Sequence, residues 1–169
     1  SILYIFFISS LLIGAYKPLY EINIKMILAY SGILNFSYLL LTLIIHSTTS
    51  TIGFYLYLTQ YVITHIVIFI IILIMGSYQR ESISNWSPVT YIHQLRVPNK
   101  TLIGCLIIAL FSLIGLPPLP GFYAKLLVFI SAISSNYILE SLLIVFFSVI
   151  ATYYYANIIK VIIINSKEV

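Results

Sequence analysis

One lysine of this sequence lies where a charged side chain is least expected, inside a long apolar stretch. Lys125 follows the segment GLPPLPGFYA, and the apolar run around it extends from Thr101 to Ser134. Inside a membrane or a protein core, an amine loses the water that stabilises its charge, so its charged and neutral forms come closer in free energy. The chemistry that this residue offers is therefore the gain and loss of a proton.

Three prolines precede the lysine and interrupt the helix that such an apolar run would otherwise form. A proline in a helix interior removes a backbone donor and clashes with the preceding turn, at a cost of about 3 kcal/mol or more. Pro117, Pro118, Pro120 and Gly121 therefore predict a helix break at 116–121, followed by a second half-helix. In hydrocarbon, a break is tolerated only where protein or water covers it, so we expect this segment to face a protein interior or a wet cavity.

The position of Lys125 after the break suggests how its charge is regulated. It would lie in the first turns of the second half-helix, near the positive end of the helix dipole, where a cation is disfavoured. Desolvation and the dipole are then both expected to oppose the protonated form. The alternatives are a purely structural kink and a lysine that reaches the membrane surface. Against the latter, Lys125 is nine residues from the nearer end of its segment, roughly 13 Å of helix.

Composition places these residues in a membrane protein. Of 169 residues, 62% are hydrophobic and 7% are charged, with a mean hydropathy of +1.11, whereas an average soluble protein has about 25% charged residues. The eight Lys and Arg residues are scattered and form no basic patch with interleaved aromatic residues, which argues against nucleic-acid binding. Cys105 is the sole cysteine of the sequence, so the chain cannot build a disulfide, a metal quartet or an iron–sulfur cluster.

The predicted fold is an all-α integral membrane protein with about five transmembrane helices, the fourth of them discontinuous. A span needs about 20 apolar residues. The chain is expected to form one membrane domain, 1–169, with a hydrophilic loop at 76–99 and spans at 1–16, 23–45, 52–75, 101–134 (broken at 116–121) and 137–164. Apart from Lys125, the basic residues fall into the first and third connections and the C-terminal end, on one side of the membrane, as the positive-inside rule requires.

Other polar residues lie within the predicted spans. Along one face of the second span, at helical spacing, are Ser31, Asn35, Tyr38 and Thr42. Helix packing and the lining of a water path are both compatible with this face. His65 lies near the middle of the third span, where a buried neutral histidine and a proton relay are both compatible with its position. Glu140 lies near the surface end of the last span, and this position favours a hydrated charge at the end of a helix. It is also the one acid of the sequence that could pair with Lys125 from within the membrane.

The sequence contains none of the common catalytic motifs. It has no H-E-x-x-H, no P-loop, no dinucleotide fingerprint and no paired carboxylates. We therefore predict that this chain carries no redox site, no metal and no cofactor.

Two motifs resemble one family of membrane proteins. SLIGLPPLPGFYAKLLVF, residues 112–129, resembles the broken twelfth helix of the antiporter-like subunits of respiratory complex I, and KMILAYSGILNFSYLLL, residues 25–41, resembles their tenth helix. The lysine after GF-x-x and the short third connection are similar to the subunit-2 type of the mitochondrial NADH:ubiquinone oxidoreductase. Asn35 and Ser37 stand where the family usually has His–x–Gly, so the resemblance does not by itself imply a relay role for this helix.

The resemblance implies a proton-translocating, non-redox subunit of a proton-pumping NADH:ubiquinone reductase. Electron transfer on other subunits would drive proton pumping through a buried lysine, and Lys125 matches the distal lysine of the family. The family fold contains two inverted repeats, each with a discontinuous helix. The chain would correspond to roughly helices nine to thirteen of that fold, and a separate chain is expected to supply the missing N-terminal half of the module.

The resemblance also implies partners and a location. Flavin, iron–sulfur clusters and quinone are expected on other subunits, with no cofactor on this chain. The implied partners are other membrane subunits of complex I and membrane lipids, in the mitochondrial inner membrane or, alternatively, a bacterial plasma membrane. Two other functions are compatible with the sequence: a cation/proton antiporter subunit without redox partners, and a structural membrane subunit in which Lys125 has no role in transport.

Overall fold

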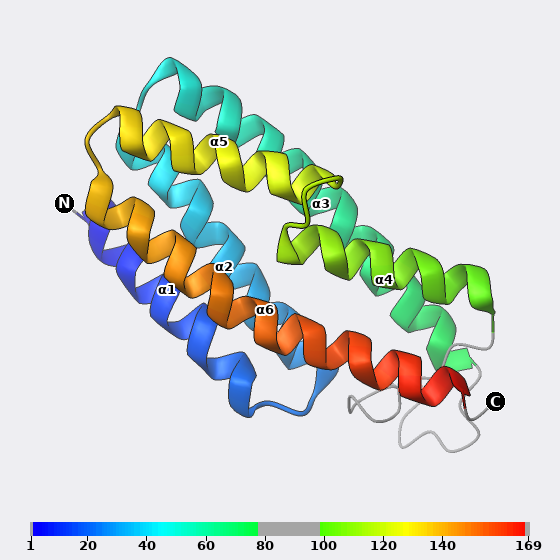
Figure 1. Cartoon of the computed structure of the whole chain (residues 1–169). Coiled ribbons are helices and arrows are strands. Elements are labelled where there is room, and N and C mark those ends of the chain that lie inside the picture. Colours follow the sequence, from blue (N-terminus) through cyan, green and yellow to red (C-terminus); the bar gives the residue numbers. More distant parts are fainter. Residues whose placement is uncertain (1, 78–98, 168–169) are drawn as a thin grey trace.

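The computed structural model describes residues 2–77 and 99–167, and these residues form helices joined by short connections (Figure 1). The helices are α1 (Ile2–Tyr20), α2 (Ile24–Ile45), α3 (Thr48–Ser77), α4 (Lys100–Ile114), α5 (Pro120–Ser134) and α6 (Ile138–Lys167). By length and hydropathy, α1, α2, α3 and α6 can each cross a membrane, and α4 and α5 are shorter apolar helices. The all-α membrane fold is thus confirmed. Most of the predicted hydrophilic loop at 76–99 lies outside the described residues.

The predicted discontinuous span is confirmed as the pair α4 and α5. The first half-helix ends at Ile114, and Gly115 follows in the left-handed region with φ +98°. The second begins at Pro120, so the predicted break at 116–121 extends too far. Pro120 and Gly121 belong to the first turn of α5 because a proline at the first helical position lacks only an N–H that would have no helical partner.

A proline lies inside α1, which extends to Tyr20 rather than ending at 16. Pro18 has no N–H to donate to the carbonyl of Gly14, one turn earlier. The hydroxyl of Tyr154 in α6 donates to this carbonyl instead, at 3.3 Å. A side chain from another helix therefore satisfies the backbone group that the proline leaves free, and this allows the helix to continue.

The third helix begins at Thr48, four residues before the predicted start at 52. Two serines cap its N-terminus reciprocally. The backbone N–H of Ser50 donates to Ser47 Oγ at 3.1 Å, and the N–H of Ser47 donates to Ser50 Oγ at 2.7 Å. This exchange satisfies N–H groups that have no helical partner, so polar residues outside the apolar run become part of the helix.

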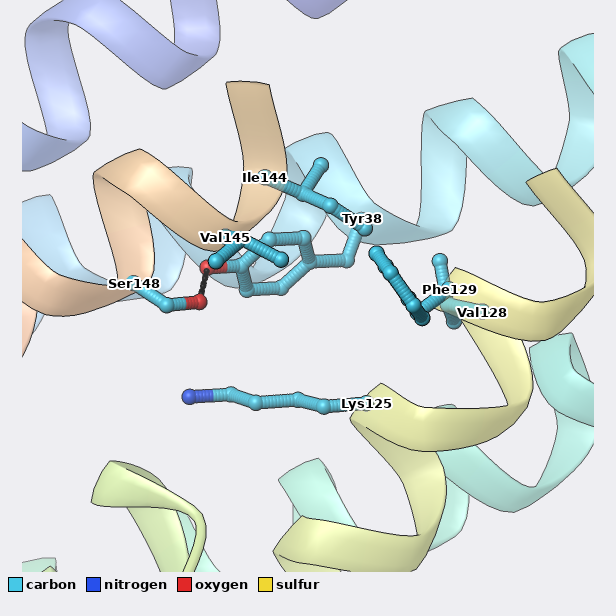
Figure 2. Close-up of a pocket in the computed structure, with 7 residues that line it drawn as sticks. All are labelled: Tyr38, Lys125, Val128, Phe129, Ile144, Val145 and Ser148. Atoms are coloured by element: carbon cyan, nitrogen blue, oxygen red, sulfur yellow. Dashed lines mark hydrogen bonds between the residues drawn. The ribbon is translucent and has the colours of Figure 1, made fainter. Parts of the chain in front are cut away.

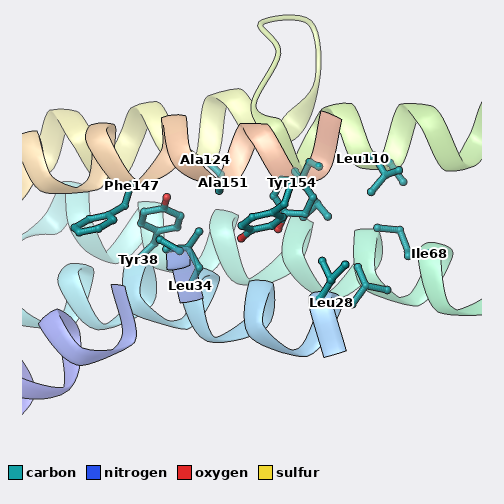
Figure 3. Close-up of a cluster of buried hydrophobic side chains, with 14 of the residues drawn as sticks. Leu28, Leu34, Tyr38, Ile68, Leu110, Ala124, Phe147, Ala151 and Tyr154 are labelled. Carbon is teal, nitrogen blue, oxygen red and sulfur yellow. The ribbon is translucent and has the colours of Figure 1, made fainter. Parts of the chain in front are cut away.

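The second helix lies at the centre of the bundle and is the most buried of the four long spans. It packs against α1, α3, α5 and α6. The contact with α1 is close, because a Cβ on Gly14 would come within 2.6 Å of the Leu34 backbone. Figure 3 shows Tyr38 and Leu34 of α2 facing Phe147, Ala151 and Tyr154 of α6 in the apolar core. The two halves of the broken span pack on α3 and α6. The break itself is not covered by the described residues, because Leu116, Pro117, Pro118 and Pro120 are exposed, so the expectation that it faces the interior of this chain is wrong.

Candidate functional site

Lys125 lies in the second turn of α5, and its side chain crosses to the end of α4. Its Nζ donates hydrogen bonds to the carbonyl oxygens of Leu113, at 2.8 Å, and Ile114, at 3.2 Å. These are the last two carbonyls of α4, at the negative end of that helix, where a lysine can satisfy groups without helical donors. Lys125 does lie near the N-terminus of α5, as expected, but the negative end of α4 offsets the dipole of α5. The charge contacts the favourable end of α4, and desolvation remains to oppose it.

The two prolines explain why these carbonyls are available. In a continuing helix, the carbonyl of residue 113 would accept from the N–H of residue 117, and that of residue 114 from the N–H of residue 118. Both of these residues are prolines and have no N–H. Pro117 and Pro118 thus remove the donors of the two carbonyls that bind Lys125. The helix break and the lysine form one site.

Two glycines allow the half-helices to approach each other closely. Gly115 lies beside the lysine side chain, and a Cβ there would come within 3.3 Å of Lys125 Cδ. At Gly121, the N–H lies 3.3 Å from Ser112 Oγ, and a Cβ would come within 1.7 Å of the Ser112 carbonyl oxygen. No side chain larger than a hydrogen atom fits at position 121 in this arrangement. The first turn of α5 is therefore in direct backbone contact with the last turn of α4.

On its other side, the lysine contacts a buried aromatic ring. Nζ lies 5.7 Å from the ring centroid of Tyr38, a distance typical of a cation–π contact. The Tyr38 hydroxyl is 2.8 Å from Ser148 Oγ in α6. These three residues line a cavity of about 50 Å³, whose remaining walls are Val128, Phe129, Ile144 and Val145. Figure 2 shows the lysine extended alongside the tyrosine ring, with its nitrogen toward the two hydroxyls.

The polar face of α2 continues this hydrogen-bonded cluster into the core. The rings of Tyr38 and Tyr57 are 5.4 Å apart, and the Tyr57 hydroxyl donates to the side-chain oxygen of Asn35. Asn35 also donates to the carbonyl of Ser31 at 2.8 Å. The hydroxyl of Thr42, farther along this face, bonds within its own helix to Leu39. All of the predicted face residues are buried, and each has a protein partner.

The structure places His65 away from the contacts of Lys125. Its Nδ1 is 3.1 Å from the Tyr61 carbonyl oxygen one turn earlier, and its ring lies against the Tyr61 ring, with centroids 4.3 Å apart. Its Nε2 is buried and has no hydrogen-bond partner among the described residues. The described hydrogen-bond and ring contacts of His65 are on α3, so His65 and Lys125 do not share a hydrogen-bonded group.

Glu140 is also separate from the lysine. It lies in the first turn of α6, where it is partly exposed and interacts with the Tyr4 hydroxyl of α1. Ser148, which does line the lysine cavity, is eight residues later, about 12 Å along the helix. The described hydrogen-bond partners of the Lys125 ammonium are neutral carbonyls rather than this carboxylate.

Comparison with protein families identifies the group to which this arrangement belongs. Residues 1–151 match the family described as "NADH:quinone oxidoreductase/Mrp antiporter, TM". The chain belongs to this family. The resemblance stated from the broken-helix and AYS motifs is thereby confirmed.

The relatives within the NADH:quinone oxidoreductase/Mrp antiporter family include fungal and bacterial proteins. NADH-ubiquinone oxidoreductase chain 2 of Debaryomyces hansenii is 52% identical over 164 residues, which cover 97% of this chain and 36% of the relative. The protein of the same name from Rhizopus oryzae is 38% identical, covering 90% and 30%. NADH-quinone oxidoreductase subunit N of a Wolbachia species is 37% identical, covering 89% and 31%. The chain thus spans about a third of the length of these relatives.

Chains of two solved membrane complexes have the same fold as this chain. A chain of the Mrp complex from a Dietzia species superposes with a TM-score of 0.79 at 21% identity, covering 95% of this chain and 30% of that chain. A chain of the membrane-bound sulfane sulfur reductase, an archaeal respiratory membrane complex, gives 0.82 at 20% identity, covering 99% and 34%. At these identities the comparison shows the shared antiporter-type fold.

Sequence reasoning on this antiporter-family chain missed how the lysine is held. It did not pair Lys125 with the Leu113 and Ile114 carbonyls, although the four-residue spacing to Pro117 and Pro118 would have identified them. It also did not join Tyr38 and Ser148, which lie 110 residues apart in the sequence. No pattern in the sequence signals that contact.

Proposed function

We propose that this chain is part of a proton-translocating membrane subunit of an NADH:quinone oxidoreductase, with Lys125 as the group that gains and loses the proton. The observation that carries this proposal is the binding of the lysine ammonium by two carbonyls at a helix break, together with the family assignment. A residue held in this way within a span is a functional-site candidate by default, because an ionisable group in the membrane is costly.

The geometry supports a mechanism in which the protonated and neutral forms of Lys125 are close in free energy. The carbonyl end of α4 and the Tyr38 ring stabilise the ammonium, while burial opposes it. A neutral amine still has two N–H groups, so it can keep its bonds to both carbonyls after a proton leaves. Small changes in the local field or hydration would then change proton occupancy without moving the side chain. In this proposal, such changes follow redox events on other subunits.

The same proposal assigns the redox groups to other subunits and defines the partners of this chain. This chain acts as a non-redox part of the enzyme, and flavin, iron–sulfur clusters and quinone belong to other subunits. Its partners are neighbouring membrane subunits, the remainder of its own antiporter-type module and lipids. Fungal relatives named NADH-ubiquinone oxidoreductase chain 2, at 52% identity, favour the mitochondrial inner membrane over a bacterial plasma membrane.

A second candidate function is cation/proton antiport without a redox partner, which the fold shared with the Mrp complex favours. Purification from native membranes separates the two candidates. Co-purification with flavin- and iron–sulfur-containing subunits supports the oxidoreductase, and isolation in a complex without these subunits overturns it.

The role of Lys125 is tested in the native membrane complex with the Lys125→Met variant. We expect normal assembly and NADH oxidation but a clear loss of protons moved per NADH oxidised, because methionine fills the space of the side chain without titrating. An unchanged proton ratio would show that the lysine is structural and would overturn the proposed mechanism.

A further inference from the structure

A hydroxyl pair from α2 and α6 lies beside the lysine, outside the helix break. Tyr38 Oη and Ser148 Oγ are 2.8 Å apart, and either atom can be the donor. Tyr38 is 2% exposed, and it comes from α2, whereas Ser148 comes from α6. Together with Lys125, they provide the polar groups among the residues that line the cavity of about 50 Å³.

We propose that Tyr38 and Ser148 form a two-hydroxyl proton relay for Lys125, completed by one water molecule in this cavity. The inference rests on the proposed function, since a relay requires that the lysine exchange a proton. It adds two residues to the transfer path and assigns each of them a single role, which is to pass a proton without keeping it.

The ammonium has three N–H bonds, and the structure accounts for two of them. These two donate to the carbonyls of Leu113 and Ile114. The third proton is the one that can leave without loss of these bonds. Nζ lies over the Tyr38 ring, and Figure 2 shows it on the side of the cavity where both hydroxyls lie. The exchangeable proton is therefore adjacent to the hydroxyl pair.

The cavity has the size and the polar groups that a water molecule requires. One water occupies about 30 Å³ in the liquid and needs two to four polar partners. The cavity volume is about 50 Å³, and Lys125, Tyr38 and Ser148 supply three partners. A water bridging a polar gap is nearly as favourable as a direct hydrogen bond. It would join Nζ to the hydroxyls.

Ser148 connects the cavity to the surface of the chain. A groove of about 370 Å³ runs between the helix break and α6, and Ser148 and Thr152 are the hydroxyl-bearing residues on its α6 wall. Because Ser148 lines both spaces, it can accept a proton on the cavity side and release one on the groove side. Lys125 also lines the groove, so direct exchange with the groove is the alternative route.

The transfer conserves protons at every oxygen. One N–H bond of the ammonium breaks as its proton passes to the water, and the water gives one of its protons to Tyr38. The tyrosine releases its own hydroxyl proton to Ser148, which releases its own to the groove. The net result is one proton moved from Nζ to the groove, and the hydrogen bonds of the pair point in the opposite direction afterwards.

The test uses Tyr38→Phe and Ser148→Ala in the full protein, within its native membrane complex. Tyr38→Phe keeps the ring under the lysine and removes only the hydroxyl. We expect both variants to assemble and to lose as much of the proton-per-NADH ratio as Lys125→Met. Ser148→Thr retains a hydroxyl and is expected to restore the ratio.

Two matched controls remove hydroxyls outside the relay. Ser131 is fully buried and bonds within its own helix to Val128 at 2.8 Å, and Tyr123 is 54% exposed on α5. Ser131→Ala and Tyr123→Phe are expected to keep the wild-type ratio. A loss in these controls equal to that in the relay variants would overturn the relay.

The remaining outcomes separate the relay from the proposed function. If Lys125→Met loses pumping while Tyr38→Phe and Ser148→Ala keep it, the lysine exchanges directly and the relay is wrong. Reduced assembly in either hydroxyl variant would show that the pair joins α2 to α6 and would also overturn the relay. If Lys125→Met itself pumps normally, the proposed function fails.

Discussion

The Lys125 ammonium is 2.8 Å from the carbonyl oxygen of Leu113, a carbonyl that has no helical donor because residue 117 is a proline. The same relation joins the ammonium to Ile114, at 3.2 Å, through Pro118. The proline pair thus has a direct electrostatic role. It supplies two backbone dipoles that hold a cation where the surroundings are apolar.

This relation predicts the effect of Pro117→Ala and Pro118→Ala. Each variant restores an N–H that can bond to the carbonyl four residues earlier and compete with the lysine. We expect helix α4 to extend, with unchanged or greater stability, and proton transfer to decline while NADH oxidation persists. The measurement is the proton-to-NADH ratio in membranes containing the assembled complex. A wild-type ratio in the double variant would show that the carbonyl contacts do not matter for transfer.

Replacement of the lysine by arginine separates charge from titration. Arginine keeps the positive charge and can bond to carbonyls, but it stays protonated at any working pH. Lys125→Arg is therefore expected to assemble and to lose proton transfer to the same extent as Lys125→Met. Pumping at the wild-type ratio in the arginine variant would mean that a fixed charge suffices and that proton exchange at this position is not required.

The contact between the half-helices predicts a severe effect of Gly121→Ala. The new Cβ would be 1.7 Å from the Ser112 carbonyl oxygen, so the backbone must shift. We expect a loss of at least about 3 kcal/mol in stability, seen as poor assembly on native gels. Gly104→Ala in α4 is the matched control, because nothing lies within 4 Å of its Cβ position. It should be neutral or more stable by about 1 kcal/mol, and equal damage at both sites would contradict the close contact.

The proline inside α1 predicts a compensating pair of substitutions. Tyr154→Phe leaves the Gly14 carbonyl without its donor, at an expected cost of about 1–3 kcal/mol. Pro18→Ala restores an N–H for this carbonyl, so the double variant should recover the loss in thermal stability of the purified complex. Tyr153→Phe, which removes a hydroxyl from a residue that is 67% exposed, serves as the control. A failure of the alanine to rescue would mean that the tyrosine acts through packing alone.

The helix ends show where local patterns were insufficient. Apolar runs located each of the four long spans, but α1 and α3 extend past those runs because capping and side-chain contacts satisfy backbone groups that lack helical partners. The reciprocal serine cap at Ser47 and Ser50 lengthens α3, and Tyr154 lets α1 continue through Pro18. Hydropathy measures the transfer of side chains into lipid and carries no information on these hydrogen bonds.

The sequence by itself determined the membrane class, the broken span and the choice of Lys125 as the candidate for proton transfer. These follow from composition, from the missing N–H groups of proline and from the cost of a charge in lipid, all of which are local properties. Tertiary structure alone decided what the lysine contacts. Its side chain turns toward the end of α4, and α2 and α6 bring Tyr38 and Ser148 to it. Such neighbours depend on how separate helices pack, and no spacing within one segment specifies that packing.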